Sequence, residues 1–143
     1  MLQTTPFDTA FAGIVLLLGR VLFGGILAFT GINHFMQTEQ MAGYAEAKGV
    51  PAAGLMVPFT GGMLVVGGLA IVLGVYPIVG AGALALFLLV STPLMHDFWN
   101  APEEQQQTEM TQFLKNVSLL GGSLVFLALA GVEWPYSLGL GLL

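Results

Sequence analysis

The stretch LVVGGLAIVLGVYPIVGAGALALFLLVSTP, residues 64–93, decides the fold of this chain. It holds two long apolar runs that are separated only by GVYP, residues 74–77. Each run belongs to an apolar block with the length of about 20 residues that a membrane-spanning helix needs. A link this short makes the two helices antiparallel neighbours, and Pro77 suits the first turn of the second helix. We therefore expect a membrane hairpin at the centre of the chain.

The composition of the whole chain agrees with a membrane protein. Of its 143 residues, 56% are hydrophobic and only 8% are charged, whereas soluble domains carry about 25% charged residues. A chain this short cannot bury so much apolar surface inside itself, so the excess must face lipid. The net charge of −5, with only three Lys and Arg, excludes nucleic acid as a partner. Because Cys is absent, this chain alone can form no disulfide, thiolate metal site or thiol relay.

Four apolar blocks define the predicted helices, at residues 11–35, 55–75, 78–95 and 113–132. Only helices or closed barrels satisfy the backbone polar groups in lipid. The predicted fold is therefore all-α, a bundle of four antiparallel transmembrane helices in a single domain over residues 1–143. The N-terminal segment lacks the basic region of a secretory signal, and the block after it is too long for one. We expect that block to remain as the first membrane helix.

Because successive membrane helices run in opposite directions, most of the polar residues are expected on one membrane face. The first and third helices run the same way, so the ends that carry His34 and His96 lie on one membrane face. The start of the fourth helix, with Lys115 and Asn116, lies on that face too. Both long polar connections are there as well, and we call this side the long-loop face. The opposite face holds the termini and the GVYP turn.

The stretch LMHDFWN, residues 94–100, concentrates chemically capable side chains on the long-loop face. One interpretation makes His34, His96 and Trp99 interfacial residues, since Trp is typical of the membrane–water boundary. A second makes the two His hydrogen-bond partners in a pocket for a quinone or another lipid-like ligand, with Phe35, Phe98 and Trp99 stacking around the ring. A third joins the two His to Asp97 as metal ligands, but adjacent ligands make it the weakest, and we predict no metal site. The candidate pocket consists of His34, His96, Trp99, Lys115 and Asn116.

Arg20 is the most unusual residue, because it lies near the middle of the first apolar block. A charge there costs roughly 2.5–3.5 kcal/mol on insertion scales, which marks an intramembrane polar residue as a candidate functional site. Arg20 is consistent either with a structural anchor that bonds backbone carbonyls or with a ligand site. The apolar blocks contain no acid to pair with it. The hydroxyls of Ser and Thr within these blocks commonly bond the preceding helical turn, so we expect no hydrolase and predict no catalytic residue.

Five segments carry a resemblance to a known family. They are GRVLFGGILAFTGINHF, MAGYAEAKGVP, VVGGLAIVLG, MHDFW and QFLKNVSLLGG, in this order along the chain. The chain resembles the DoxX family of small four-helix membrane proteins. The resemblance implies a four-helix bundle in the plasma membrane. Some relatives are associated with quinone-linked sulfur oxidation and others with membrane complexes that counter oxidative stress. The positions that match the family pattern are Arg20, His96, Phe98, Trp99, Lys115 and Asn116.

One departure from the family pattern concerns the neighbour of Arg20. Many members carry a Glu in the second helix shortly before the Gly pair, and that position is Leu64 here. Arg20 therefore lacks the intramembrane counter-ion that a buried Arg–Glu pair would need.

Three functions follow as hypotheses. The leading one is a membrane subunit of a redox or oxidative-stress-related complex, with a quinone as the candidate cofactor. The alternative is a non-catalytic membrane scaffold or assembly protein. The third is a small anion transporter or channel that would work as an oligomer, with Arg20 lining the path. The partners expected are the lipid bilayer, other proteins of a membrane complex and further copies of the chain.

Overall fold

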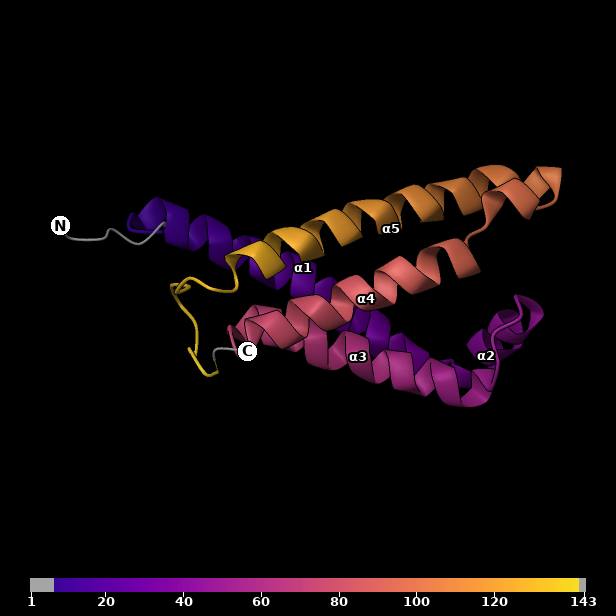
Figure 1. Cartoon of the computed structure of the whole chain (residues 1–143), viewed down its shortest axis with the longest axis horizontal. Helices are drawn as coiled ribbons and strands as arrows, with labels where there is room; N and C mark the ends of the chain where they lie inside the picture. Colours follow the sequence, from indigo (N-terminus) through magenta and orange to yellow (C-terminus); the bar gives the residue numbers. More distant parts are fainter. Residues whose placement is uncertain (1–6, 142–143) are drawn as a thin grey trace.

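The computed structural model describes residues 7–141, and the secondary-structure elements within them are helices joined by short links and followed by a non-helical C-terminal stretch (Figure 1). Four of the helices are long and apolar enough to cross a membrane. The helices, in chain order, are α1 (Ala10–Met36), α2 (Thr38–Ala47), α3 (Ala53–Leu73), α4 (Pro77–Met95), the short 3-10 helix η1 (Phe98–Asn100) and α5 (Glu103–Leu129). The predicted class, an all-α bundle of four apolar helices, is confirmed.

The two polar connections fold further than the sequence suggested. The first contains the ten-residue helix α2. The second is mostly the start of α5, which begins at Glu103, ten residues before the predicted position 113, and ends at Leu129 rather than at 132. Glu and Gln favour helix, and the acids Glu103 and Glu104 in the first turn suit the positive end of the helix dipole. At 1.5 Å per residue, α5 therefore extends about 15 Å beyond its apolar part.

The helices pack in the order α1, α3, α4 and α5, with the closest approach between α1 and α3. A Cβ atom added to Gly31 of α1 would lie 2.6 Å from the carbonyl oxygen of Gly61 of α3. At Gly24, a Cβ would overlap the carbonyl oxygen of Gly68. Only glycine lets the two backbones come this close, a form of packing common between membrane helices.

Most of the apolar surface of the bundle faces outward. Of the apolar windows of α1 and α5, only 22% and 11% of the residues are buried inside the molecule. A soluble protein of this size would not leave such a surface in water. The interior is a small cluster of apolar side chains from all four long helices and the C-terminal segment: Leu27, Leu64, Ile71, Ala81, Leu84, Phe126 and Trp134.

The chain after α5 folds back onto the turn between α3 and α4. The backbone N–H of Tyr76 donates to the carbonyl of Leu140 at 2.8 Å, and that of Leu138 donates to the carbonyl of Leu73 at 2.9 Å. Gly74, which ends α3, adopts a left-handed φ of 69°. These bonds dock residues 132–141, which we call the C-terminal segment, on the end of the bundle opposite α2 (Figure 1).

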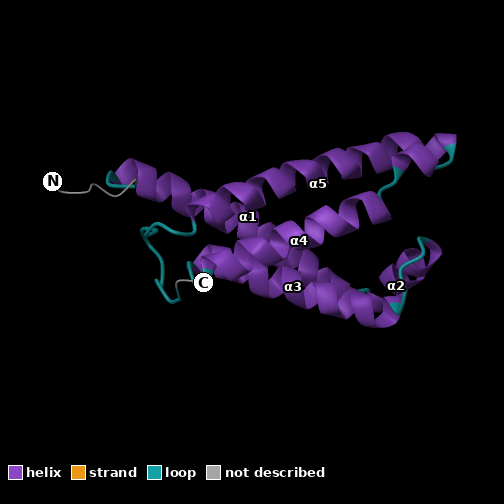
Figure 2. Cartoon of the chain, viewed as in Figure 1, coloured by secondary structure: helices purple, strands orange, loops and turns teal. Residues whose placement is uncertain are grey.

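Both long connections lie at one end of the bundle, as alternation of direction predicts. Figure 2 shows α2 and the link between α4 and α5 at the same end, away from the start of α1 and from the C-terminal segment. The hydroxyl of Tyr44, on α2, donates to the carbonyl of Met95, at the end of α4, at 3.1 Å. The long-loop face thus consists of α2, η1 and the polar start of α5, which lie together at one end of the bundle.

Candidate functional site

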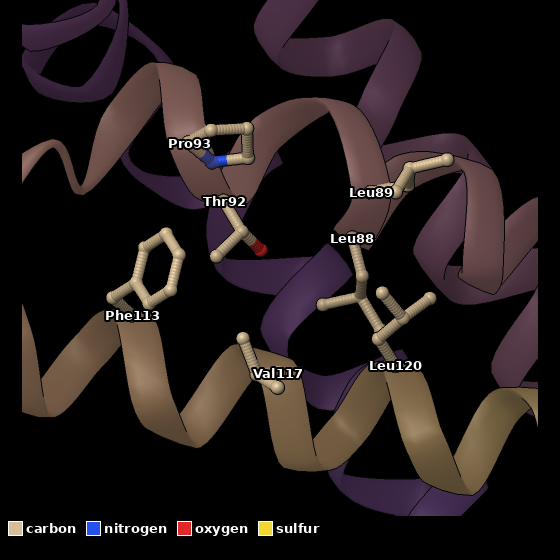
Figure 3. Close-up of a pocket in the computed structure, with 7 residues that line it drawn as sticks. All are labelled: Leu88, Leu89, Thr92, Pro93, Phe113, Val117 and Leu120. Carbon is tan, nitrogen blue, oxygen red and sulfur yellow. The ribbon is translucent and has the colours of Figure 1, made fainter.

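A cavity of about 190 Å³ lies between α4 and α5, just inside the long-loop face. Its lining is almost wholly apolar, and Figure 3 shows the side chains of the two helices facing each other across it. The lining residues are Leu88, Leu89, Thr92 and Pro93 from α4, and Phe113, Val117 and Leu120 from α5. Antiparallel packing and the four-residue spacing of Leu88 and Thr92, and of Phe113 and Val117, place these side chains on facing stripes.

Thr92 is the polar residue of this cavity. Its side chain is only 4% exposed, and its hydroxyl oxygen points between α4 and α5 (Figure 3). Within residues 7–141, this oxygen has no hydrogen-bond partner. Ser118 and Ser123 of α5 instead donate to the carbonyls four residues before them, at 3.2 and 3.0 Å, as expected for hydroxyls in membrane helices. Thr92 departs from that expectation, since a buried hydroxyl normally finds a partner.

Pro93 adds a second polar feature beside Thr92. Proline has no N–H, so residue 93 cannot donate the usual helical bond to the carbonyl of Leu89. Both Leu89 and Pro93 line the cavity. The cavity therefore combines a hydroxyl group with a backbone carbonyl that lacks its usual helical donor, and apolar walls surround both.

Phe113, which lines the cavity, belongs to a cluster of aromatic side chains with η1. Phe113 packs edge-to-face against Phe98 and Trp99 of η1, with ring centroids 5.4 and 5.8 Å apart. Phe98 and Trp99 also contact each other, at 5.2 Å. Trp99 is 53% exposed, so part of its ring lies on the outside of the molecule. Phe98, Trp99 and Phe113 thus form one aromatic cluster, whereas Phe35, the other ring of the expected pocket, lies on α1 and is not part of it.

A polar cluster lies one helical turn beyond the cavity. Nδ1 of His96 lies 2.9 Å from one carboxylate oxygen of Glu109, and the other oxygen accepts a 2.9 Å hydrogen bond from the hydroxyl of Tyr44. Burial and the bond to Glu109 raise the pKa of Tyr44. Lys48 and Asp97 form an ion pair at 2.6 Å beside this cluster. The hydrogen bond to Asp97 raises the pKa of Lys48.

The other residues of the predicted pocket do not join His96 and Trp99. His34 is buried and lies 3.1 Å from the carbonyl of Val57 and 3.2 Å from the hydroxyl of Thr60, so it ties α1 to α3. Lys115 is exposed and donates to Gln112 on its own helix. Asn116 is buried, next to the cavity-lining Val117. His34 and His96 share no hydrogen-bond partner, and residues 7–141 hold no cluster of three potential metal ligands.

Arg20 is fully buried and bonds only to backbone carbonyls. Nε donates to the carbonyl of Ile71 at 3.0 Å, Nη1 to that of Pro135 at 2.7 Å, and Nη2 to those of Val72 and Tyr136 at 2.7 and 3.1 Å. Two of these carbonyls belong to the last turn of α3, where orphan carbonyls need donors. Arg20 thus joins α1, α3 and the C-terminal segment.

The surroundings of Arg20 explain how the chain tolerates a charge here without an acid. Within the described residues, its guanidinium forms no ion pair, and Leu64, near which the resemblance implies a Glu in many relatives, is fully buried. The ring of Trp134 lies 5.4 Å from the guanidinium and adds a cation–π contact. With four donors committed to carbonyls and no solvent exposure, Arg20 gives no support to a path for anions.

Sequence reasoning missed three residues of the site: Thr92, Phe113 and Glu109. For Thr92, the signal was the proline that follows it, because a proline disturbs the helical turn on which a hydroxyl would bond. For Glu109, the polar stretch before 113 was interpreted as a loop. As part of a helix, Glu109 lies four residues before Phe113 and therefore on the same side of α5.

Four spanning apolar helices, Arg20 buried among carbonyls and a cavity that opens between two of the helices define a multi-pass integral membrane protein. Comparison with known families agrees with this class. The family model DoxX matches residues 15–97, which is 83 of the 143 residues and covers α1 to the end of α4. The chain belongs to the DoxX family. No curated protein and no solved structure matched it. The segment QFLKNVSLLGG in α5 lies outside the matched range.

Proposed function

We propose that this DoxX-family protein is a plasma-membrane subunit of a redox or oxidative-stress-related complex, and that it binds a quinone-like ring in the α4–α5 cavity. The observation that carries the proposal is the hydroxyl of Thr92, which is buried, lines the cavity and lacks a partner within the described residues. An unpaired buried hydroxyl costs about 1–3 kcal/mol. A ligand oxygen in the cavity would remove that cost.

The size and lining of the cavity favour a ring with a lipid-like tail. Typical small-molecule pockets measure about 300–1,000 Å³, and this one has about 190 Å³. It therefore suits a single substituted ring, while a long apolar tail would remain in the lipid between α4 and α5. Phe113 offers an aromatic contact, and Thr92 offers a hydrogen bond to a ring oxygen. Both features match a quinone head group better than a fully apolar lipid.

Protein partners are part of the proposal. Because the chain has no Cys, any thiol chemistry linked to the ring would come from another subunit. The long-loop face offers the surface for such a partner, since α2 and the first ten residues of α5 extend from the apolar bundle. Further copies of this chain could contribute to the same complex through the outward apolar faces.

Ligand binding by a matched pair of variants tests the proposal. The variant Thr92→Val keeps the shape of the side chain and removes the hydroxyl. Thr30→Val is the control, because Thr30 bonds the carbonyl of Ile26 on α1, outside the cavity. A short-chain 1,4-benzoquinone is titrated into protein in nanodiscs by calorimetry. Loss of one hydrogen bond, worth about 1–1.5 kcal/mol, predicts about tenfold weaker binding to Thr92→Val.

Two outcomes would overturn the proposal. The first is the absence of quinone binding to the wild-type protein, after the heat of partitioning into empty nanodiscs has been subtracted. The second is equal affinity of the wild type and Thr92→Val. Either result would favour the non-catalytic scaffold, for which the cavity is only a packing defect.

A further inference from the structure

We infer that His96 and Glu109 form the polar end of the α4–α5 cavity and make it select rings with hydroxyl groups, such as a quinol, over rings with carbonyls. The inference rests on the proposed function, since it names the form of the ring that this cavity takes. Three observations carry it: the position of the pair, the hydrogen bonds of Glu109 and the free nitrogen of His96.

The pair bridges the same two helices as the cavity. His96 follows Thr92 by four residues, and its backbone N–H donates to the carbonyl of Thr92 at 3.0 Å. Glu109 precedes Phe113 by four residues on α5. Residues at this spacing are neighbours on a helix surface. The 2.9 Å contact between Nδ1 of His96 and Glu109 therefore lies one turn beyond Thr92 and Phe113, towards the long-loop face.

Glu109 decides which nitrogen of His96 carries the proton. An ionised carboxylate only accepts hydrogen bonds, and Glu109 accepts one from Tyr44 on its other oxygen. Nδ1 of His96 must then be the donor in their contact. In a neutral imidazole the other nitrogen, Nε2, is left as an acceptor. Nε2 has no hydrogen-bond partner among residues 7–141, and the His96 side chain is 23% exposed.

These roles discriminate between the two forms of a quinone. The hydroxyl of Thr92 can donate or accept, so it serves either form. Neutral Nε2 of His96 only accepts, so it bonds the hydroxyl of a quinol and opposes the carbonyl of a quinone. His96 follows the last residue of α4, and its backbone N–H still bonds the carbonyl of Thr92, one helical turn back. One turn is about 5.4 Å, a separation that suits the two oxygens on opposite sides of one ring, one at Thr92 and the other at His96.

The hydrogen bonds around His96 keep Nδ1 as its donor. The charged and titratable groups around His96 are known from every neighbouring element. Glu109 of α5 and Tyr44 of α2 form one chain of hydrogen bonds with it, and Lys48 pairs with Asp97 beside it. Glu109 is the group in direct contact with His96, so it is the positioning residue for this selection.

A matched pair of ligands tests the inference. A short-chain 1,4-hydroquinone and the benzoquinone of the same substitution are titrated anaerobically into protein in nanodiscs. We expect the hydroquinone to bind about tenfold more tightly, the worth of one hydrogen bond. Glu109→Gln should abolish the preference. An amide can donate to Nδ1 as well as accept from it, so it also permits the tautomer in which Nε2 carries the proton. Glu104→Gln, an exposed carboxylate on the same helix, should retain it.

The outcomes separate this inference from the proposed function. If both rings bind with equal affinity and Thr92→Val weakens both, the cavity is a ring site but the selection by His96 is wrong. If neither ring binds, the proposed function itself fails. Retention of the preference in Glu109→Gln would also overturn the inference. Should Glu109→Gln not fold, as judged by thermal unfolding, His96→Phe provides the second variant, for which the inference again requires equal affinity for the two rings.

Discussion

At the scale of single residues, Thr92 and Arg20 show two opposite solutions for a polar group inside an apolar bundle. Arg20 commits its donors to four carbonyls. Thr92 is also buried, at 4% exposure, yet its hydroxyl has no partner in residues 7–141. The first arrangement is typical of a structural anchor. The second is typical of a site that a ligand completes, because proteins rarely leave a buried hydroxyl unpaired.

This contrast predicts that Thr92→Val stabilises the ligand-free protein. The substitution removes an unpaired polar atom and keeps nearly the same side-chain volume, so we expect a gain of about 1 kcal/mol in the free energy of unfolding. Thermal unfolding in detergent measures it against Thr30→Val, which loses a satisfied hydrogen bond and should gain nothing. A destabilised Thr92→Val would mean that the hydroxyl is satisfied within the protein.

Arg20 should show the opposite behaviour. Substituting it with Met leaves the carbonyls of Ile71, Val72, Pro135 and Tyr136 without their donor. We expect a loss of about 3 kcal/mol or more. Arg20→Lys should also destabilise the protein, because an ammonium cannot span four acceptors as the planar guanidinium does.

The C-terminal segment provides the measurement for Arg20. Loss of its two bonds to that segment should make residues 132–141 accessible to proteases in the Arg20 variants, in addition to lowering the thermal midpoint. Lys115→Gln removes an exposed charge and should change stability by no more than about 0.5 kcal/mol. Wild-type protease resistance in Arg20→Met would show that the backbone bonds at Tyr76 and Leu138 hold the segment alone.

At the scale of helices, the close contact of α1 and α3 depends on which glycine faces the partner. Gly24→Ala places a Cβ against the carbonyl oxygen of Gly68, a backbone atom that cannot move aside cheaply. We expect a loss of about 1–3 kcal/mol from overpacking. Gly25→Ala is the matched control, since a Cβ there meets nothing within 4 Å and alanine favours helix. Thermal unfolding compares the two, and equal midpoints would refute this packing.

The sequence predicts a helix well where the length of its apolar run determines its position. The central hairpin, the four blocks and the shared end of the two long connections all follow from hydropathy and alternation. The start of α5 was misjudged because Glu and Gln are equally common in polar loops and in solvated helices. Lipid does not restrict that stretch, so only its contacts with α2 and η1 reveal its role.

The geometry around the candidate site was harder to predict than the helices, for a different physical reason. His96 and Trp99 stood out by residue type, and the structure places them in contact with Glu109 and Phe113 of α5. His34 shares their membrane face but bonds α3, because a shared face does not fix which helices are neighbours. The acceptors of Arg20 are backbone carbonyls, which every residue has and no sequence pattern marks. Thr92 needed the geometry of Pro93 and of α5 to be recognised.

At the scale of the whole molecule, the polar groups are divided unequally between the two ends. The long-loop face carries α2, η1, the polar start of α5 and the cluster of His96, Glu109 and Tyr44. The other end carries the C-terminal segment and the tight turn at Gly74. Under the proposed function, a ring that enters from the lipid between α4 and α5 would meet its polar contacts at the long-loop end. A water-soluble partner that exchanges electrons or protons with such a ring would then approach from that side.

The absence of Cys makes this polarity directly measurable by labelling. Single substitutions Glu39→Cys, Glu104→Cys and Glu133→Cys each place a thiol at an exposed position. In sealed vesicles of one orientation, a membrane-impermeant thiol reagent should label the first two from the same side. Glu133→Cys should be labelled only after the vesicles are opened, or from the opposite side in inverted vesicles. Because α2 and the start of α5 belong to one polar surface, labelling of Glu39→Cys and Glu104→Cys from different sides would break the alternation on which the whole topology depends.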